Sequence, residues 1–319
     1  MNTKTTAPGS TLSSPTAPTA SASLSPAGLP FRAVSWNLLN GGLDGAGEVR
    51  LDAQVGYLAD LGPDILALQE CTRWDEKDRA EMVAAELGLA ITAMTLSRVG
   101  DGRNHTMLLH NPARFSLVEV RLRGAEIFHH ALIKARLRPH GAPSDGSGDL
   151  NVLATHLSWT DGTTRLAEAG WMTDYAGPFP GEPDRALLLG DLNCPHPDDV
   201  IDWSDVPRNL QSRYRLVLPD GTFGDADTRA CQVLLNSGWQ DPETLTGQPR
   251  AATVGHYYEN EPTPMRLDHV LVHNLAVRSY RTHETGRASD HKPVVLDAVL
   301  TDRIRRPRTT EATTGAPAP

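Results

Sequence analysis

The sequence lacks the features by which membrane-spanning, disulfide-stabilised and DNA-coating proteins are recognised. No apolar run approaches the roughly 18 residues that a membrane-spanning helix needs, so we predict no membrane span. Acidic residues outnumber basic ones by 39 to 30, which gives a net charge of −9. This excess of acid excludes the broad basic surface of a protein that coats DNA without regard to base sequence.

Cysteine is scarce as well. The chain has three cysteines, Cys71, Cys194 and Cys231, an odd number without CxxC or zinc-finger spacing. This excludes both a disulfide framework and a structural zinc site, and it is typical of a reducing compartment. A secretory signal needs an apolar stretch of about 7–15 residues, and prolines interrupt every such stretch near the N-terminus. We therefore expect a cytoplasmic protein.

Both ends of the chain are poor in residues that form a core. Of residues 1–30, 22 are Thr, Ser, Ala or Pro, which predicts a disordered tail because too little apolar surface can be buried. Residues 303–319 hold four arginines and then Thr, Ala and Pro, which predicts a flexible tail, either solvated or touching phosphate. Residues 31–302, with 25 basic and 38 acidic residues, are long enough for one large domain or two small ones, and no linker interrupts them.

The hydrophobic pattern predicts an α/β fold. Apolar runs and period-two alternation predict strands at 31–36, 64–68, 91–94, 106–110, 115–122, 131–137, 151–155, 186–189, 267–272 and 294–300. Helical spacing predicts helices at 51–61, 79–87, 164–175 and 227–237. Because strand pairs alternate with strand–helix units, we expect two sheets packed face to face with helices outside.

Polar residues follow the predicted strands at several places, where α/β proteins usually carry their chemistry. Asp191 and Asn193 project to the same side of an extended chain and offer an acceptor and a donor to a water molecule and an anionic oxygen. Gly190 before them lets the chain bend and a ligand approach. The alternative is a simple turn in which the Asp191 side chain caps the backbone.

Three further residues offer oxygen ligands for a divalent cation. Glu70 and Asp290 are carboxylates and Asn37 is an amide, a set suited to Mg²⁺ or Mn²⁺ with water and substrate phosphate completing the shell. Taken singly, Glu70 is equally compatible with a solvent-facing carboxylate at a helix N-terminus. Asn37 is equally compatible with a turn, because Asn40-Gly41-Gly42 follows.

Two histidines are suited to acid–base chemistry. His291 follows Asp290, and Asp268 on the preceding predicted strand can hold its ring in one tautomer. His156 follows another predicted strand and is a candidate to act on a leaving group. Each histidine is also compatible with a hydrogen-bonded core or surface residue, so the case for a site depends on the combination.

The combination resembles the endonuclease/exonuclease/phosphatase superfamily of metal-dependent phosphohydrolases, which includes DNase I-like nucleases, abasic-site endonucleases, inositol polyphosphate phosphatases and neutral sphingomyelinases. The matching segments, in the family's order, are Val34-Ser35-Trp36-Asn37, Leu68-Gln69-Glu70, Thr155-His156-Leu157, Leu189-Gly190-Asp191-Leu192-Asn193, Arg266-Leu267-Asp268-His269-Val270 and Ala288-Ser289-Asp290-His291-Lys292-Pro293-Val294. They span nearly the whole region between the tails, and six segments in order are far more specific than any one.

The resemblance implies a four-layer α/β/β/α sandwich of two mixed sheets with outer helices, formed by residues 31–302 as one domain. It also implies that the active site lies at one edge of the sheets and holds Mg²⁺, or Mn²⁺, on Glu70 with Asn37 and Asp290 nearby. The expected reaction is hydrolysis of a phosphomonoester or phosphodiester by direct in-line attack of water.

The same resemblance implies a role for each of the remaining residues. Asp191 would orient or deprotonate the water, and Asn193 would hold a phosphoryl oxygen. His291, oriented by Asp268, would act on the scissile phosphate or the water. His156 would stabilise or protonate the leaving oxygen. Members of the superfamily differ in whether the aspartate or the histidine is the base, so that choice stays open here.

Differences between this sequence and known subclasses of the superfamily restrict the class of substrate. Inositol polyphosphate phosphatases carry Pro-x-Trp-Cys-Asp-Arg where residues 264–269 read Pro-Met-Arg-Leu-Asp-His, and the signal peptide and disulfides of secreted sphingomyelinases are missing. Residues 31–302 are acidic, with a net charge of −13, which favours a small phosphorylated metabolite, a nucleotide or a lipid head group over a nucleic acid.

Other interpretations stay open. An endo- or exonuclease acting on DNA or RNA is the alternative. Arginines gathered on one rim of the site would favour this alternative, and the candidates are Arg98, Arg103, Arg121, Arg123, Arg136 and Arg138. Trp36, Trp74, Trp159 and Trp171 either stack on a base or pack in the core. A binding module without turnover is disfavoured because no expected site residue is missing. Nothing in the sequence indicates an obligate protein partner.

Overall fold

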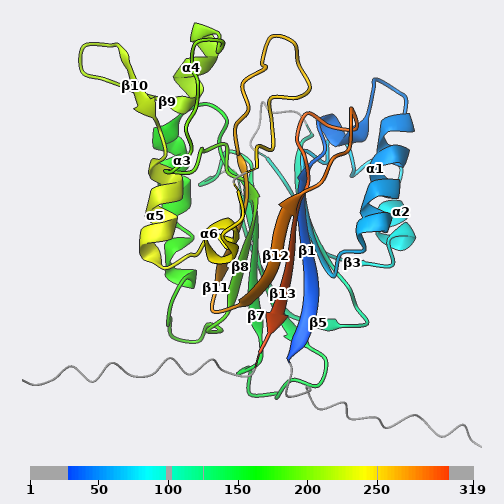
Figure 1. Cartoon of the computed structure of the whole chain (residues 1–319). Helices are drawn as coiled ribbons and strands as arrows, with labels where there is room; N and C mark the ends of the chain where they lie inside the picture. Colours follow the sequence, from blue (N-terminus) through cyan, green and yellow to red (C-terminus); the bar gives the residue numbers. More distant parts are fainter. Residues whose placement is uncertain (1–27, 98–102, 125, 250, 302–319) are drawn as a thin grey trace, which may run out of the picture.

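The computed structural model describes residues 28–97, 103–124, 126–249 and 251–301 (Figure 1). These residues form two mixed sheets packed face to face. The first sheet has the order β12 (Ala276–Thr282), β13 (Val294–Leu300), β1 (Leu29–Asn37), β2 (Ile65–Gln69), β4 (His105–His110) and β3 (Ala90–Leu96). The second has the order β11 (Asp268–His273), β8 (Ala186–Asp191), β7 (Leu150–His156), β6 (Ala131–Pro139) and β5 (Phe115–Arg123). Each sheet contains one parallel pair, β1 with β2 and β7 with β8.

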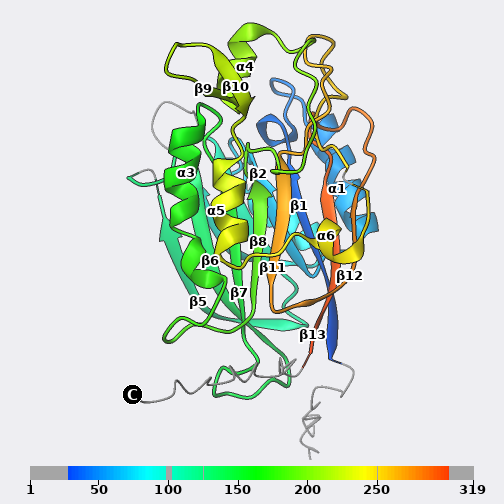
Figure 2. The ribbon, with the colours of Figure 1, turned by 60° about the vertical axis from the view of Figure 1, so that its left-hand side comes forward.

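Helices cover the outer faces of both sheets. The helices are α1 (Val49–Leu61), α2 (Arg79–Glu86), α3 (Gly162–Gly170), α4 (Arg208–Tyr214), α5 (Arg229–Ser237) and α6 (Pro242–Thr246). Figures 1 and 2 show α1 and α2 on the first sheet and α3 and α5 on the second. The predicted four-layer α/β/β/α sandwich is thereby confirmed.

Alternation along the central strands explains why they are apolar on both faces. In β1, Phe31 and Ala33 point into the core between the sheets, whereas Val34 and Trp36 point into the core beneath α1 and α2. In β8, Leu189 points inward and Leu188 packs beneath α3 and α5. A strand buried on both faces is apolar at every position, as predicted for 151–155 and 186–189.

The structure corrects several boundaries. β1 begins at Leu29, within the predicted N-terminal tail, because Leu29 and Pro30 pair with Leu300 and Val299 of β13. Residues 1–27 of that tail and the predicted tail 303–319 lie outside the described residues. The predicted helix 164–175 ends at Gly170, and a 3-10 turn, η2 (Thr173–Tyr175), follows.

Other elements have a weak hydrophobic pattern and were not predicted. β12 is an edge strand in which only Tyr280 is buried, and only Leu210 of α4 is buried. Several elements are too short to show a clear pattern. They are the hairpin of β9 (Arg215–Val217) and β10 (Phe223–Ala226), the 3-10 turn η1 (Asn40–Gly42) and α6. The predicted last strands belong to different sheets, since β11 pairs with β8 and β13 with β1 and β12.

Among the described residues, no helix combines the length and apolar character needed to cross a membrane.

Candidate active site

One edge of the two sheets gathers the predicted site residues. The carboxyl ends of β1, β2, β7 and β8 meet at this edge, together with the start of β11 and the segment before β13. A cavity of about 630 Å³ opens there. Seven of the eight predicted residues line it, namely Asn37, Glu70, His156, Asp191, Asn193, Asp290 and His291. The eighth, Asp268, lies behind His291 and contacts it.

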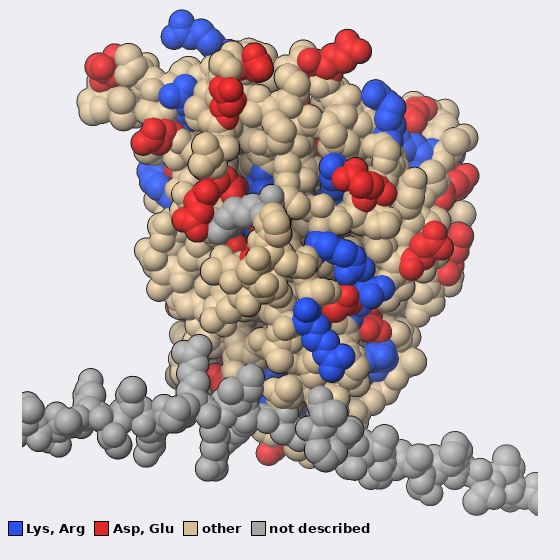
Figure 3. Space-filling view, viewed as in Figure 1, with Lys and Arg blue, Asp and Glu red and all other residues tan. Residues whose placement is uncertain are grey.

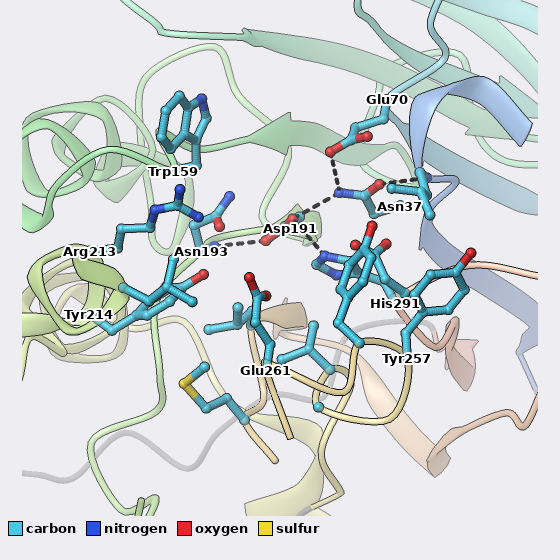
Figure 4. Close-up of a pocket in the computed structure, with 18 of the residues that line it drawn as sticks. Asn37, Glu70, Trp159, Asp191, Asn193, Arg213, Tyr214, Tyr257, Glu261 and His291 are labelled. Atoms are coloured by element: carbon cyan, nitrogen blue, oxygen red, sulfur yellow. Dashed lines mark hydrogen bonds and ion pairs between the residues drawn. The ribbon is translucent and has the colours of Figure 1, made fainter. Parts of the chain in front are cut away.

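Asp191 is the residue to which most of these side chains turn (Figure 4). Its Oδ1 accepts from the Asn193 backbone N–H at 2.8 Å, and its Oδ2 accepts from Asn37 Nδ2 at 3.0 Å. The same Oδ2 lies 3.4 Å from His156 Nε2 and 3.8 Å from His291 Nε2. Burial raises the pKa of the Asp191 carboxyl, although His291 and the hydrogen bonds oppose this shift. The cluster therefore surrounds one carboxylate with donors while leaving it at the cavity wall.

His291 is held between two carboxylates. Its Nδ1 lies 2.7 Å from Asp268 Oδ2, and the β11–β8 pairing places Asp268 directly opposite Asp191. Burial disfavours the charged ring, but Asp268 and Asp191 outweigh it and hold the pKa of His291 well above its usual value. With Nδ1 turned to Asp268, Nε2 faces Asp191 and the cavity. The arrangement fixes the tautomer and orientation of the ring.

His156 is held in a different electrostatic state. Its ring stacks on that of His130, with centroids 3.7 Å apart and planes 5° from parallel. Burial, with the charges of His291 and His129, lowers the pKa of His156 to about 3. A neutral imidazole donates a hydrogen bond but does not readily give up a proton. The lowered pKa of His156 favours the uncharged ring at this position.

Glu70 and Asn193 occupy strained backbone positions at the site. Both have positive φ, 55° for Glu70 and 47° for Asn193, which is uncommon for residues other than glycine and tends to occur at functional sites. The turn aims the Glu70 carboxylate at the cavity, where it accepts from the Asn40 backbone N–H at 2.8 Å and from Asn37 Nδ2 at 3.3 Å. Asn193 donates its Nδ2 to the Leu157 carbonyl at 3.1 Å, which leaves its second amide N–H for a ligand.

The donor set at Glu70 fits a hard divalent cation. Burial and the neighbouring charge of Asp290 raise the pKa of Glu70, so the two carboxylates repel one another. A cation between them would relieve this repulsion, and carboxylate oxygens with water are the ligands that Mg²⁺ and Mn²⁺ prefer. Asn37 turns its N–H donors to Glu70 and Asp191, so in this structure it links the two carboxylates. A second group of possible ligands, with atoms within 4.8 Å of one another, comprises Asp191, Asp268 and His291.

The structure shows a reason for glycine at position 190 that was not predicted. A Cβ at this position would lie 2.2 Å from the Thr155 carbonyl oxygen, so glycine permits the close approach of β7 to β8. Asn193, with φ of 47°, lies in the turn that follows, and the space beside Gly190 is taken by the neighbouring strand.

The arginines that would favour a nuclease do not gather at the cavity among the described residues. Arg136 and Arg138 pair with Asp149, and Arg103 pairs with Asp75 and Glu76. None of these, nor Arg121 or Arg123, lines the cavity, and Arg98 lies outside the described residues. Among the tryptophans, Trp36 and Trp74 are core residues, and Trp171, 49% exposed, lies outside the cavity. Trp159 is in the cavity wall.

The cavity is also lined by residues that were not predicted. They are Arg213 and Tyr214 from the end of α4 and Tyr257, Tyr258 and Glu261 from the segment before β11; Figure 4 labels all of them except Tyr258. Burial and the charge of Asp191 raise the pKa of the Tyr214 phenol to about 12. These residues lie on a short helix or in a connecting segment and follow no predicted strand, so only the tertiary structure brings them to the site.

Comparisons with known proteins identify the family. A model of the Endonuclease/Exonuclease/phosphatase family matches residues 34–291. The chain belongs to this family. Its predicted resemblance is thereby confirmed, and the match runs from β1 to His291 of the site. The search of curated proteins found no match.

Solved structures share the fold at low sequence identity. An endonuclease/exonuclease/phosphatase from Bacteroides vulgatus superposes with a TM-score of 0.60 at 14% identity, covering 84% of this chain and 98% of that one. ANGEL2, a 2′,3′-cyclic phosphatase, gives 0.57 at 14% identity over 86% and 96% of the two chains. The human Nocturnin catalytic domain with bound sulfate gives 0.55 at 17% identity over 85% and 93%. These likenesses concern the fold.

Proposed function

We propose that this protein is a hydrolase of phosphoesters that depends on Mg²⁺ or Mn²⁺. The observation that carries the proposal is the arrangement of Asp191 and His291 at one wall of the cavity, with Asp268 behind His291 and the carboxylates of Glu70 and Asp290 lining the same cavity. Phosphoester hydrolysis requires an aligned water, neutralisation of the phosphoryl oxygens and help for the departing oxygen. The site holds a group suited to each of these tasks.

The residues divide the reaction as follows. Asp191 accepts a proton from the water as its oxygen attacks phosphorus in line and the bond to the leaving oxygen breaks. His291, kept charged by Asp268, and the free amide N–H of Asn193 stabilise the phosphoryl oxygens. Neutral His156 donates a hydrogen bond to the leaving oxygen, which takes its proton from solvent.

The metal would be held by Glu70 and Asp290. When bound, a divalent cation there neutralises phosphoryl charge and lowers the pKa of a coordinated water. Asn37 donates to both Glu70 and Asp191, so it would hold the metal-binding carboxylate of Glu70 at a fixed position relative to the proton-accepting carboxylate of Asp191. No protein nucleophile is required.

The shape of the site supports a small substrate. The cavity of about 630 Å³ lies within the range of roughly 300–1,000 Å³ typical of small-molecule sites. Trp159, Tyr257 and Leu210 line it, and among the described residues Arg213 is the one Lys or Arg that does so. A duplex groove binder needs several cations along its contact surface. We therefore favour a small phosphorylated metabolite, a nucleotide or a lipid head group, with a nuclease as the alternative; a cytoplasmic location rests on the sequence alone.

The test is hydrolysis of a phosphoester panel with Mg²⁺, Mn²⁺ or EDTA. The panel contains bis-p-nitrophenyl phosphate, nucleoside monophosphates, sugar phosphates, a phospholipid, plasmid DNA, RNA and, because one structural neighbour is a 2′,3′-cyclic phosphatase, a 2′,3′-cyclic nucleotide. We expect EDTA to abolish turnover and both Asp191→Asn and His291→Gln to reduce kcat by about 10²–10⁴-fold. Asp60→Asn on the exposed face of α1 is the control and should leave kcat unchanged.

Two results would contradict the proposal. One is full activity in both site variants. The other is no turnover of any panel member by a folded protein that binds Mn²⁺, which would support a binding module.

A further inference from the structure

The cavity carries one positive side chain among several acidic ones. Among the described residues that line it, Arg213 is the single Lys or Arg, whereas Glu70, Asp191, Asp290 and Glu261 are acidic. The Arg213 guanidinium lies over the Trp159 ring, 4.8 Å from its centroid. No described carboxylate forms an ion pair with it, in contrast to Arg215 and Arg229 nearby, whose side chains are occupied by Gln211 and Asp227. Arg213 therefore presents its hydrogen-bond donors to the cavity.

The fold anchors the backbone of Arg213 and leaves its side chain free. The Arg213 carbonyl accepts from Nη2 of the buried Arg165 at 2.5 Å, and Leu210, one turn earlier on α4, is buried. The next residue, Tyr214, also lines the cavity, and its carbonyl accepts from the Asp227 backbone N–H at 2.7 Å. These contacts involve backbone atoms or neighbouring side chains, so a substitution of the Arg213 side chain does not remove them.

We propose that Arg213, supported by Trp159, binds a second anionic group of the substrate, so that the preferred substrates carry a phosphate or carboxylate in addition to the scissile phosphoester. The inference rests on the proposed function, which assigns the scissile phosphoryl group to His291 and Asn193 and leaves Arg213 without a role. Guanidinium binds phosphate and carboxylate through two parallel hydrogen bonds, and stacking on an indole ring orients it and shields it from water.

The charge distribution in the cavity gives the second anion one place to bind. Figure 4 shows Arg213 beside Trp159 and Asn193, and Glu261 below Asp191 next to Tyr214. An anionic group extended toward Glu261 would be repelled, whereas one extended past Asn193 reaches the guanidinium.

The test compares matched substrates with one and two anionic groups. The pairs are adenosine 3′-monophosphate with adenosine 3′,5′-bisphosphate, and fructose 6-phosphate with fructose 1,6-bisphosphate. For at least one pair we expect the intact protein to have a lower KM for the bisphosphate. Arg213→Gln should raise that KM by about 10–100-fold more than the KM of the matched monophosphate, with a smaller effect on kcat. Arg213→Lys, which keeps the charge but loses the fork, should restore part of the difference.

The control is Arg208→Gln. Arg208 is exposed at the other end of α4 and does not line the cavity, so its removal changes the net charge equally but should not alter either KM. The pair with the larger preference indicates whether the second anion is carried on a nucleoside or on a sugar. An equal rise of KM for mono- and bisphosphate in Arg213→Gln would mean that Arg213 holds the scissile phosphate, and no rise would mean that it holds neither. Both results overturn the inference.

Binding separates this inference from the proposed function. If no substrate is hydrolysed, the proposed function fails, and calorimetric titration with adenosine 3′,5′-bisphosphate and the monophosphate in Mg²⁺ still tests the subsite. Tighter binding of the bisphosphate that is lost in Arg213→Gln supports the inference. Equal binding of the two nucleotides overturns it.

Discussion

At the scale of single residues, the site depends on how a few buried polar groups restrain one another. Asn37 donates to both Glu70 and Asp191, so it connects the carboxylate assigned to the metal with the carboxylate assigned to the water. The side-chain oxygen Oδ1 of Asn37 accepts from the Leu39 backbone N–H at 3.0 Å, which fixes the orientation of the amide. The Asn37 backbone carbonyl in turn accepts from Ser289 Oγ at 2.7 Å, two residues before His291. A displacement of one of these side chains is therefore expected to displace the groups that are hydrogen-bonded to it.

Removal of the Glu70 carboxylate should weaken metal binding. We expect Glu70→Gln to lower the affinity for Mn²⁺, measured by calorimetry, by at least about 10–100-fold, the range found for lost outer-shell partners of metal sites. Activity should recover partly at high Mn²⁺ concentration. Glu86→Gln, at an exposed position of α2, is the control of equal charge. An unchanged Mn²⁺ affinity in Glu70→Gln would move the metal to the group of Asp191, Asp268 and His291.

At the scale of elements, the parallel pair β7 and β8 determines the separation of His156 and Asp191. These residues are register partners at the carboxyl ends of the two strands, and Thr155 pairs with Gly190 one step before them. Because Gly190 has no side chain, the Thr155 carbonyl can lie where a Cβ would be. The site geometry at this point is thus a direct result of strand pairing.

Gly190→Ala should disturb both stability and activity. A Cβ 2.2 Å from the Thr155 carbonyl forces the strands apart, and we expect a loss of about 1–3 kcal/mol in the free energy of unfolding, with reduced kcat. Gly56→Ala, at an exposed position of α1 with no atom within 4 Å, should instead stabilise the protein by roughly 0.5–1 kcal/mol. Urea denaturation of the two variants measures both effects. A Gly190→Ala protein as stable as the parent would show that the strands can separate without cost.

At the scale of the whole molecule, the distribution of charge bears on substrate choice. On the face seen in Figure 3, Lys and Arg gather below the site edge, where β12 and β13 run. Arg32 and Arg281 there pair with Asp297 of β13, so part of this positive charge is neutralised. The site edge itself carries the acidic cavity. Among the described residues, a polyanion that reaches the cavity meets one Lys or Arg side chain, that of Arg213.

Duplex DNA should therefore bind weakly. For Asp191→Asn with Mg²⁺, we expect fluorescence anisotropy to show no binding of a duplex of about 30 base pairs at roughly 150 mM NaCl, and a slope of log K against log salt near −1 at lower salt. The matched variant replaces Arg303, Arg305, Arg306 and Arg308 with Gln, since these arginines lie outside the described residues. A steep slope that persists in this variant would favour the nuclease alternative. A steep slope that disappears in it would assign the contact to the C-terminal segment.

The sequence by itself determined the family, the fold class and the set of polar residues at the strand ends. Strands buried on both faces are apolar throughout, amphipathic helices repeat at 3.6 residues, and the segments around Asp191 and His291 are characteristic in order and content. All of these are local properties, because they depend on the burial of a residue and on its immediate neighbours. The assigned roles of the site residues stay predictions until activity is measured.

Only the tertiary structure decided which groups meet and what lies opposite them. The apolar character of β11 and β13 indicates burial but not the partner strand, so their places in different sheets were not predictable. Arg136 and Arg138 turn to Asp149, whereas Arg213, on a short helix with a weak pattern, turns into the cavity. The lowered pKa of His156 and the raised pKa of His291 likewise depend on burial and on charged groups far away in the sequence. Contacts between distant segments set these properties, and a local pattern contains no information about them.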